Sequence, residues 1–298
     1  MQVRIALELI GKYRQDLVLQ AIKLPRSTFN YWKKQLLNEE KMLPIEACIK
    51  AIFEENQGNY GYRRIKLALA AKGYQVNHKK VQRIMKKHHL VCTSFTRRSR
   101  SYRSYKGRVG SVAKNRVNRR FFSSLPRQKI YTDISEFHYT EINSKGIKTK
   151  RKAYLSPFLD GFNGEIIAYK FQQKPTLDCV LLPLELVIEE RKNVNYRMTI
   201  HSDQGWHYQN KQYTRRIKQA KMYQSMSRKG NCLDNALMEN FFGLMKQEMY
   251  YRRSFFSFKE LELAVTTYIH YYNHHRIKEK LTGMSPVQYR IHTSQLAG

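Results

Sequence analysis

The sequence predicts two all-α modules followed by a mixed α/β domain. Three observations support this fold class. Apolar residues recur at helical spacing up to about residue 93, a basic segment without carboxylates follows, and strand-like runs alternate with helices from about residue 125. The chain has 298 residues, 42% of them hydrophobic, which is enough to bury a core in two or three domains.

Charge restricts the class of partner. Lysine and arginine number 55 against 23 acidic residues, which gives a formal net charge of +32. Such a chain repels itself unless a polyanion neutralises it, and nucleic acid is the usual polyanion. A membrane partner is not expected, because no run of about 18 apolar residues could span a bilayer. The chain's start lacks a secretory signal pattern, so we expect a soluble cytoplasmic protein.

The four cysteines argue against a structural zinc site. Cys48, Cys92, Cys179 and Cys232 are scattered without a C-x-x-C pair. Structural zinc requires closely spaced ligand pairs, so we exclude a zinc finger and expect reduced thiols that pack as small hydrophobic side chains.

Residues 1–42 are expected to form a helix-turn-helix that binds DNA. A short breaker, Lys23-Leu24-Pro25, separates two helical stretches. Phe29 and Trp32, three residues apart on the second helix, are expected to pack inward. The residues of this helix predicted to contact DNA are Arg26, Thr28, Asn30, Tyr31 and Lys33. An ordinary helical hairpin with a solvated basic face is the alternative.

Residues 43–93 are expected to form a second helical DNA-binding module. Pro44 is expected to open its first helix, and Asn77 to cap its last one. The basic residues predicted to contact phosphates are Arg63, Arg64, Lys79 and Lys80. A solvated basic surface explains these positions equally well, so both interpretations stay open.

Residues 94–124 are expected to form a linker that follows DNA. Ten residues between positions 97 and 120 are basic and none is acidic, so like charges keep the segment extended until phosphate binds. The arginines predicted to contact DNA are Arg97, Arg98, Arg100, Arg103, Arg119 and Arg120. A simple solvated tether is the alternative.

Residues 125–298 are expected to form the α/β domain. The expected strands are residues 129–139, 152–159, 165–171 and 197–201, and the expected helices are residues 176–190, 210–220, 234–250 and 258–275. Three strands, a helix, a strand and further helices is the order of a ribonuclease-H-like sheet. We therefore predict a ribonuclease-H-like core.

Three carboxylates stand out in this domain. Asp133 lies in an apolar strand, where a lone buried carboxylate would cost several kcal/mol. Asp203 ends the next predicted strand after a helix, and Glu239 lies on an otherwise apolar helix. Three converging carboxylates can bind two Mg²⁺ ions for phosphoryl transfer to water or to a DNA 3′-hydroxyl. These residues are the predicted catalytic and metal-binding site.

The helix that carries Glu239 offers separate support. Two apolar stripes cover most of its surface, and Glu239, Gly243 and Lys246 share the narrow remaining side. A carboxylate and a cation in one row suit a metal ligand beside a phosphate contact, so Lys246 is predicted to bind DNA. A coincidence of spacing on a solvated face is the alternative.

Other polar residues are expected to lie outside the catalytic set. Strand alternation points Glu136 away from Asp133. Asp160 is expected at a turn, and Glu248 on the side of its helix opposite Glu239. His201 is expected to be a structural histidine.

The chain resembles a known family. Asp133, Asp203 and, after 35 intervening residues, Glu239 match the DDE signature of retroviral-integrase-type transposases. More closely, the chain resembles insertion-sequence transposases encoded by two overlapping frames, as their second-frame product. The motifs that carry this resemblance are His201–Gly205, Ser225–Ala236, Tyr271–Arg276, Ser285-Pro286 and Lys246, seven residues after Glu239.

The resemblance implies a catalytic core with two Mg²⁺ or Mn²⁺ ions and recognition of terminal inverted repeats in double-stranded DNA. It also implies at least a dimer on paired transposon ends, integration into target DNA, a nucleoid-associated bacterial protein and a possible fusion to an upstream-frame product. A non-catalytic DNA-binding regulator derived from a transposase is the alternative function. A tyrosine recombinase using His274-His275-Arg276 and Tyr289 is the other enzyme class considered.

Overall fold

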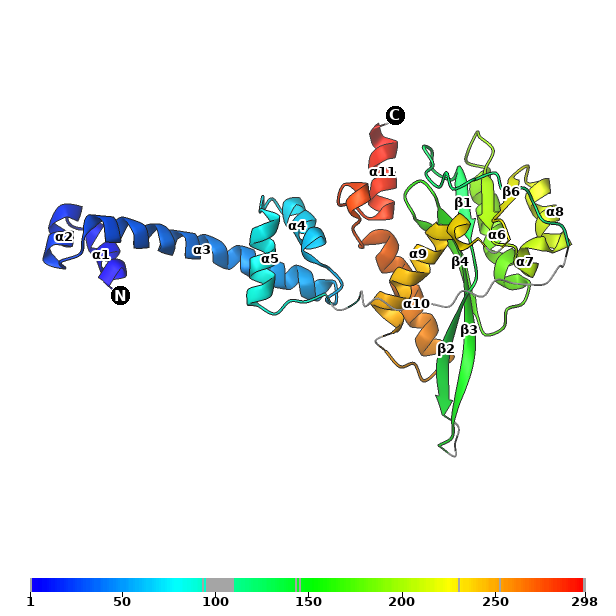
Figure 1. Cartoon of the computed structure of the whole chain (residues 1–298), viewed down its shortest axis with the longest axis horizontal. Helices are drawn as coiled ribbons and strands as arrows, with labels where there is room; N and C mark the ends of the chain where they lie inside the picture. Colours follow the sequence, from blue (N-terminus) through cyan, green and yellow to red (C-terminus); the bar gives the residue numbers. More distant parts are fainter. Residues whose placement is uncertain are drawn as a thin grey trace. The chain divides into compact units, whose positions relative to one another are not determined.

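The computed structural model describes residues 2–92, 94, 110–142, 144, 146–229, 231–251 and 253–296, without the side chains of residues 37–43 and 232. These residues form two compact units, Met1–Cys92 and Thr93–Gly298. Figure 1 shows that the first unit is all-helical and that the second contains a sheet with helices.

The first unit begins with three helices, α1 (Gln2–Ile10), α2 (Gln15–Ala21) and α3 (Arg26–Glu55). Their small core contains Ala6, Val18, Leu19, Leu24 and Phe29. Two expectations were wrong here. Pro44 lies inside the continuous helix α3 instead of opening a new helix, and Trp32 is 50% exposed instead of packed inward. Its ring contacts the neighbouring Tyr31 edge to face, at 5.4 Å between centroids.

The first unit ends with α4 (Tyr62–Ala71) and α5 (His78–Lys87), which pack with the end of α3. Asn77 caps α5, as expected, by accepting a hydrogen bond from the Lys79 amide. Buried Glu46 of α3 accepts hydrogen bonds from Lys87 and contacts His88 at 2.8 Å. This contact fixes α5 against α3.

The second unit is built on a six-stranded sheet. Its strands are β1 (Lys129–Thr132), β2 (Ser135–Ile142), β3 (Lys148–Asp160), β4 (Ile166–Gln172), β5 (Thr199–Ser202) and β6 (Tyr223–Met226). The order is β2-β3-β1-β5-β6, with β4 also paired to β3. The pairs β1–β5 and β5–β6 are parallel, and the remaining pairs are antiparallel.

The strand expected over residues 129–139 is two strands that lie end to end along β3. Thr132 of β1 pairs with Phe158, and Ser135 of β2 pairs with Leu155. Asp133 and Ile134 therefore lie at a break in the pairing. This break places Asp133 at the carboxyl end of β1 and not inside a strand.

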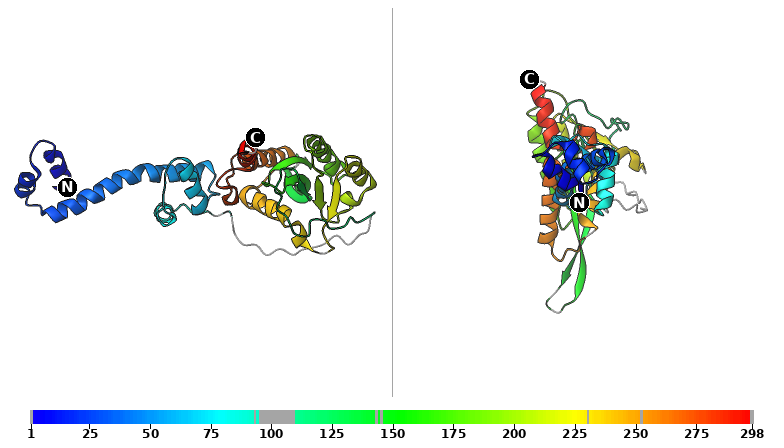
Figure 2. Two further views of the ribbon diagram at one scale, coloured as in Figure 1. Left: turned by 90° about the horizontal axis from the view of Figure 1, so that it is seen from above. Right: turned by 90° about the vertical axis from the view of Figure 1, so that its left-hand side faces the viewer.

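Helices cover both faces of the sheet (Figures 1 and 2). The helices are α6 (Asp178–Arg191), α7 (Trp206–Gln209), α8 (Lys211–Gln219), α9 (Ala236–Met245), α10 (Phe258–His274) and α11 (Pro286–Leu296). Because side chains alternate along a strand, Ile130 packs with α6 and α8, whereas Tyr131 packs with α9 and α10. A 3₁₀ turn precedes α9 and a π-helical turn, Lys246–Tyr250, follows it.

Candidate active site

Asp133 and Asp203 follow neighbouring parallel strands. The register of β1 and β5 pairs Tyr131 with His201, and each aspartate comes two residues later. Both side chains are half-buried, and each has one oxygen fixed by a backbone amide: Ile134 N donates to Asp133 Oδ1 at 2.8 Å, and Gly205 N donates to Asp203 Oδ1 at 2.9 Å. The structure thus brings these two predicted site residues together.

The negative charges of the two neighbouring aspartates repel each other. Burial raises the pKa of the Asp133 carboxyl, and the carboxylates of Asp203 and Glu239 raise it further. Burial also raises the pKa of Asp203. The ammonium group of Lys246 acts in the opposite direction on the pKa of Asp133. Such a group of like charges binds a cation favourably, because the cation removes their mutual repulsion.

Glu239 lies on α9, near enough to influence the pKa of Asp133 but exposed to solvent. Lys246 begins the π-helical turn that follows α9 and is half-buried. Its Nζ donates to the carbonyl oxygen of Glu136 at 3.0 Å and lies 4.9 Å from the centroid of the Phe137 ring. Lys246 therefore joins the π-helical turn after α9 to the first residues of β2.

The 3₁₀ turn that precedes α9 is attached to both strands, β1 and β5, that the two aspartates follow. Asn235 Nδ2 donates to the carbonyl oxygen of Thr132 at 3.3 Å. His201 Nε2 lies 2.9 Å from the carbonyl oxygen of Asp234. That oxygen can only accept, so Nε2 carries the proton and Nδ1 accepts from Ser225 Oγ at 2.9 Å. Burial lowers the pKa of His201 to about 4, which keeps the ring neutral.

The Asp234 side chain also fixes the turn that precedes α9. Its buried carboxylate accepts hydrogen bonds from Arg228, Arg119 and Asn115. The hydrogen bonds of the Arg228 side chain are the largest cause that lowers the pKa of Asp234. Sequence reasoning missed this role of Asp234, although the residue belongs to the motif Ser225–Ala236 that carried the family resemblance.

The donor chemistry of this site fits hard divalent cations. Carboxylate oxygens are the ligands that Mg²⁺ prefers, and Asp133 and Asp203 supply them side by side. Among residues 2–92, 94, 110–142 and the later described ranges, no group of three or more His, Cys, Asp or Glu side chains is arranged to hold a metal ion. Asp133 and Asp203 follow neighbouring strands, and Glu239 is exposed on α9.

The residues expected outside the catalytic set have other contacts. Glu136 forms ion pairs with Lys152 at 3.0 Å and His138 at 3.1 Å. Glu248 is buried against Arg276, with 2.6 Å between Oε1 and the guanidinium. His201 is buried and structural, as expected.

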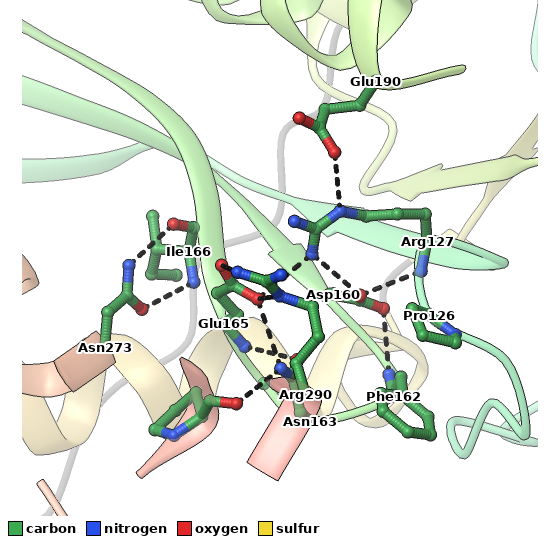
Figure 3. A network of polar contacts seen from close by, with 12 residues as sticks. Pro126, Arg127, Asp160, Phe162, Asn163, Glu165, Ile166, Glu190, Asn273 and Arg290 are labelled. Carbon is green, nitrogen blue, oxygen red and sulfur yellow. Dashed lines mark hydrogen bonds and ion pairs between the residues drawn. The ribbon is translucent and has the colours of Figure 1, made fainter. Parts of the chain in front are cut away.

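Asp160 lies at the opposite end of β1, and the interpretation of it as a turn residue was incomplete. Figure 3 shows that its buried carboxylate contacts Arg127 and that Arg127 also contacts Glu165 and Glu190. Arg290 of α11 adds a second cation to Glu165 at 2.8 Å. The network fixes the C-terminal helix to the sheet.

The predicted DNA-contacting residues of the first unit differ in exposure. Arg26, Asn30, Tyr31, Arg63 and Lys79 are exposed, whereas Thr28, Lys33, Arg64 and Lys80 are half-buried. The ammonium group of Lys33 lies 5.7 Å from the centroid of the Phe29 ring, and the Arg64 guanidinium donates to the carbonyl oxygen of Asn59 at 3.3 Å. Their contacts with DNA stay predictions.

The predicted linker contacts are only partly described. Arg97, Arg98, Arg100 and Arg103 lie outside the described residues. Arg119 and Arg120 are exposed, and the Arg119 side chain donates to Asp234 at 3.0 Å and to Asn231 at 3.2 Å. Arg119 therefore has a structural partner, which the sequence did not predict.

Comparison with protein families assigns a class to both units. Residues 39–100 match an HTH-like domain, and residues 124–232 and 239–293 match integrase core domains. The second unit is therefore an integrase core with a ribonuclease-H-like fold, which confirms the predicted fold class.

Relatives assign the family. The chain is 42% identical over 286 residues to the transposase InsK of insertion sequence element IS150 from Escherichia coli (strain K12), covering 96% of each chain. It is 44% identical over 216 residues to a transposase-like protein of Haemophilus influenzae, covering 72% of this chain and 94% of that one. The chain belongs to the insertion-sequence transposases, and its integrase core makes it a DDE polynucleotidyl transferase.

The chain also has a distant structural similarity to a solved integrase core. The HTLV-2 integrase catalytic core in complex with magnesium gives a TM-score of 0.38 at 14% sequence identity, over 56% of this chain and 97% of that chain. No helix in the described ranges is both long and apolar enough to cross a membrane.

Proposed function

We propose that Asp133, Asp203 and Glu239 are the catalytic carboxylates of this transposase and that they bind two Mg²⁺ or Mn²⁺ ions. The side-by-side position of Asp133 and Asp203 at the carboxyl ends of β1 and β5 carries this proposal. The effect of Glu239 on the pKa of Asp133 supports it as the third member. The reaction is DNA strand cleavage and strand transfer.

The chain's own residues orient the reaction. One oxygen of Asp133 and one of Asp203 is fixed by a backbone amide, which leaves the second oxygen of each for a ligand. Glu239 is exposed on α9 and joins them from the helix side. Lys246, at the start of the π-helical turn after α9, contacts a DNA phosphate. The bound ions supply activation of water or of a DNA 3′-hydroxyl and neutralise charge on the phosphate.

The tyrosine-recombinase alternative is disfavoured by two contacts. The Arg276 guanidinium is buried against Glu248 and cannot reach a phosphate without breaking that pair. Tyr289 packs against Phe162, with 5.5 Å between ring centroids. A transposase-derived regulator without catalysis would not need the paired aspartates, whose mutual repulsion has no structural benefit.

We also propose how DNA and other copies of the chain are engaged. The HTH-like part, residues 39–100, binds the terminal inverted repeats in double-stranded DNA. The helix-turn-helix region expected over residues 1–42 adds the exposed Arg26 and Asn30 as base-contacting candidates. At least two copies act on paired ends in the bacterial cytoplasm, at the nucleoid, alone or fused to an upstream-frame product. Substitution of Asn30 or Arg26 should relax discrimination at one base pair, measured with single-base variants of the end DNA.

Isosteric substitution of the three carboxylates tests the catalytic proposal. Asp133→Asn, Asp203→Asn and Glu239→Gln should each reduce excision and strand transfer by about 10³-fold or more, because each removes a metal-binding charge. Binding to the same end DNA, measured without divalent ions, should stay within about twofold of the unchanged chain.

Glu136→Gln is the matched control, since this carboxylate lies close in sequence but pairs with Lys152 and His138. It should retain excision and strand transfer. Strand transfer retained by any of the three test variants removes that residue from the triad. Loss of activity in the Glu136 variant would mean that general charge loss, and not metal binding, explains the results.

A further inference from the structure

Two segments of the second unit, which we call the catalytic unit, are rich in basic residues and poor in carboxylates. Between Glu190 and Asp234 the sequence contains ten lysines and arginines but a single carboxylate, Asp203. Residues 110–132 contain no carboxylate at all. The first of these segments contains β5, α8 and the edge strand β6, as Figure 1 shows. This separation of charge predicts a surface with positive potential.

Residues 110–116 lie against that edge. The Ala113 amide donates to Met226 Sδ at 3.3 Å, and the Arg116 amide donates to Ser225 Oγ at 2.9 Å. Gly110, with φ +112°, lies directly on the carbonyl oxygen of Gln209, where a Cβ would collide. Because its backbone is anchored on β6, the position of the Arg116 side chain is restricted.

Two arginines share the ring of Tyr223 on this edge. The guanidinium carbon of Arg197 lies 3.7 Å from the ring centroid, and that of Arg116 lies 4.3 Å from it. Both arginines are exposed, and the ring is half-buried. In the described ranges, neither guanidinium forms an ion pair with a carboxylate, whereas Arg119, Arg216 and Arg228 each do.

The positive charges of Arg116 and Arg197 repel each other, and a bound anion would reduce this repulsion. The two guanidinium groups lie within about 8 Å of each other, which is about one Debye length at physiological ionic strength. Stacking on one ring compensates part of that repulsion and restricts the position of both guanidinium groups. A planar guanidinium matches the geometry of a phosphate, and its five N–H groups need acceptors.

We propose that Arg116, Arg197 and Tyr223 form a binding site for a DNA backbone phosphate on the β6 edge of the catalytic unit. The inference rests on the DNA transposase function and adds a contact outside the carboxylate site. Tyr223 pairs with Thr199 in register, four residues before Asp203, so the site lies about 13 Å along the strands from Asp203. DNA bound at the carboxylates can reach this site within a few base pairs.

DNA binding by the full chain without divalent ions tests this site independently of catalysis. Arg116→Gln with Arg197→Gln should reduce the slope of log affinity against log salt concentration by about 0.9, the value for one lost phosphate contact. Affinity at physiological salt should fall by about three- to tenfold. Arg116→Lys with Arg197→Lys keeps both charges and should retain the slope, with weaker binding because the forked geometry is lost.

Matched controls separate the site from general charge. Lys148→Gln with Lys150→Gln removes two exposed charges on the β2–β3 hairpin and should leave the slope unchanged. Tyr223→Phe keeps the ring and should bind as the unchanged chain does, whereas Tyr223→Leu should weaken binding.

An unchanged slope in the double arginine variant, or an equal loss in the lysine control, overturns the proposal. Equal binding by the Tyr223→Leu and Tyr223→Phe variants overturns it as well. These outcomes leave the catalytic proposal intact, because loss of the carboxylates affects strand transfer and not this binding measurement.

Discussion

The carboxylates at the two ends of β1 have opposite electrostatic surroundings. At the amino end, Asp160 accepts hydrogen bonds from the Arg127 amide and guanidinium, and Glu165 contacts two arginines (Figure 3). At the carboxyl end, the strongest neighbour that acts on the Asp133 carboxylate is another carboxylate, Asp203. Burial raises the pKa of an aspartate at each end, but only the amino end supplies arginines beside it.

The difference between the two ends distinguishes carboxylates that stabilise the fold from carboxylates that we propose to bind a ligand. At the amino end the chain compensates its own charge and so fixes α11 to the sheet through Arg290 and Glu165. At the carboxyl end, burial and the carboxylates of Asp203 and Glu239 raise the pKa of Asp133, and the Lys246 ammonium offsets only part of that rise. Neighbouring carboxylates that raise each other's pKa lower the stability of the fold, and this is why we propose a cation-binding site at that end.

Removing a cation from the amino end should have the largest effect on stability. Arg127→Met leaves the fully buried Asp160 carboxylate without its guanidinium, which should cost about 3–5 kcal/mol of unfolding free energy. Denaturant unfolding measures this change. Arg151→Met, which removes an exposed pair with Glu141, is the control and should cost less than about 1 kcal/mol. Equal costs would contradict the structural role of the network.

Adding Mg²⁺ should stabilise the fold only through the aspartates at the carboxyl end of β1. Mg²⁺ at about 100 times its dissociation constant should stabilise the unchanged chain by about 2.7 kcal/mol, because it binds the folded pair of aspartates. Asp203→Asn should abolish this gain, whereas Arg127→Met should retain it. Thermal unfolding with and without Mg²⁺ measures both. An equal gain in the Asp203 variant would place the metal-dependent stabilisation elsewhere.

Part of this contrast could be predicted from the sequence. Asp133 was predicted because it is a carboxylate within an apolar stretch, and Asp203 because it ends a predicted strand; both signals are local in the sequence. The amino-end network was not found, because its contacts join Arg127 to Asp160, 33 residues away, and Glu165 to Arg290, 125 residues away. No periodicity links positions so far apart.

Two fold elements were missed for related reasons. β6 has only four residues, Tyr-Gln-Ser-Met, and lacks the apolar alternation typical of a half-buried strand. Its pairing with β5 decides its conformation. Pro44 was interpreted as a helix start because proline is common there, but α3 continues through it. Tertiary packing of α3 with α4 and α5 outweighs the local preference.

Removing one charge from the carboxyl end should stabilise the chain, the opposite sign to the Arg127 variant. Asp203→Asn keeps an oxygen that can accept from the Gly205 amide but ends the repulsion with Asp133. Without divalent ions, we expect a gain of about 1 kcal/mol in unfolding free energy. Glu141→Gln, which removes only the charge of the surface pair with Arg151, should change stability by less than about 1 kcal/mol. A destabilised Asp203 variant would show that the pair is not under repulsion.

The smallest expected effect is the pH dependence of that gain. The pKa of Asp133 is raised by burial and by Asp203, so the folded chain binds this proton more tightly than the unfolded chain does. The destabilisation from the pair is therefore complete above the raised pKa and disappears as pH falls to the ordinary aspartate pKa, about 3.9. The advantage of the Asp203→Asn variant should accordingly shrink from pH 8 toward pH 4, measured by denaturant unfolding in a chelator. Asp234 has the opposite sign, because Arg228 lowers its pKa and the resulting stability is lost only in stronger acid. A constant advantage of the variant across this range would mean that the gain arises from packing and not from removed charge.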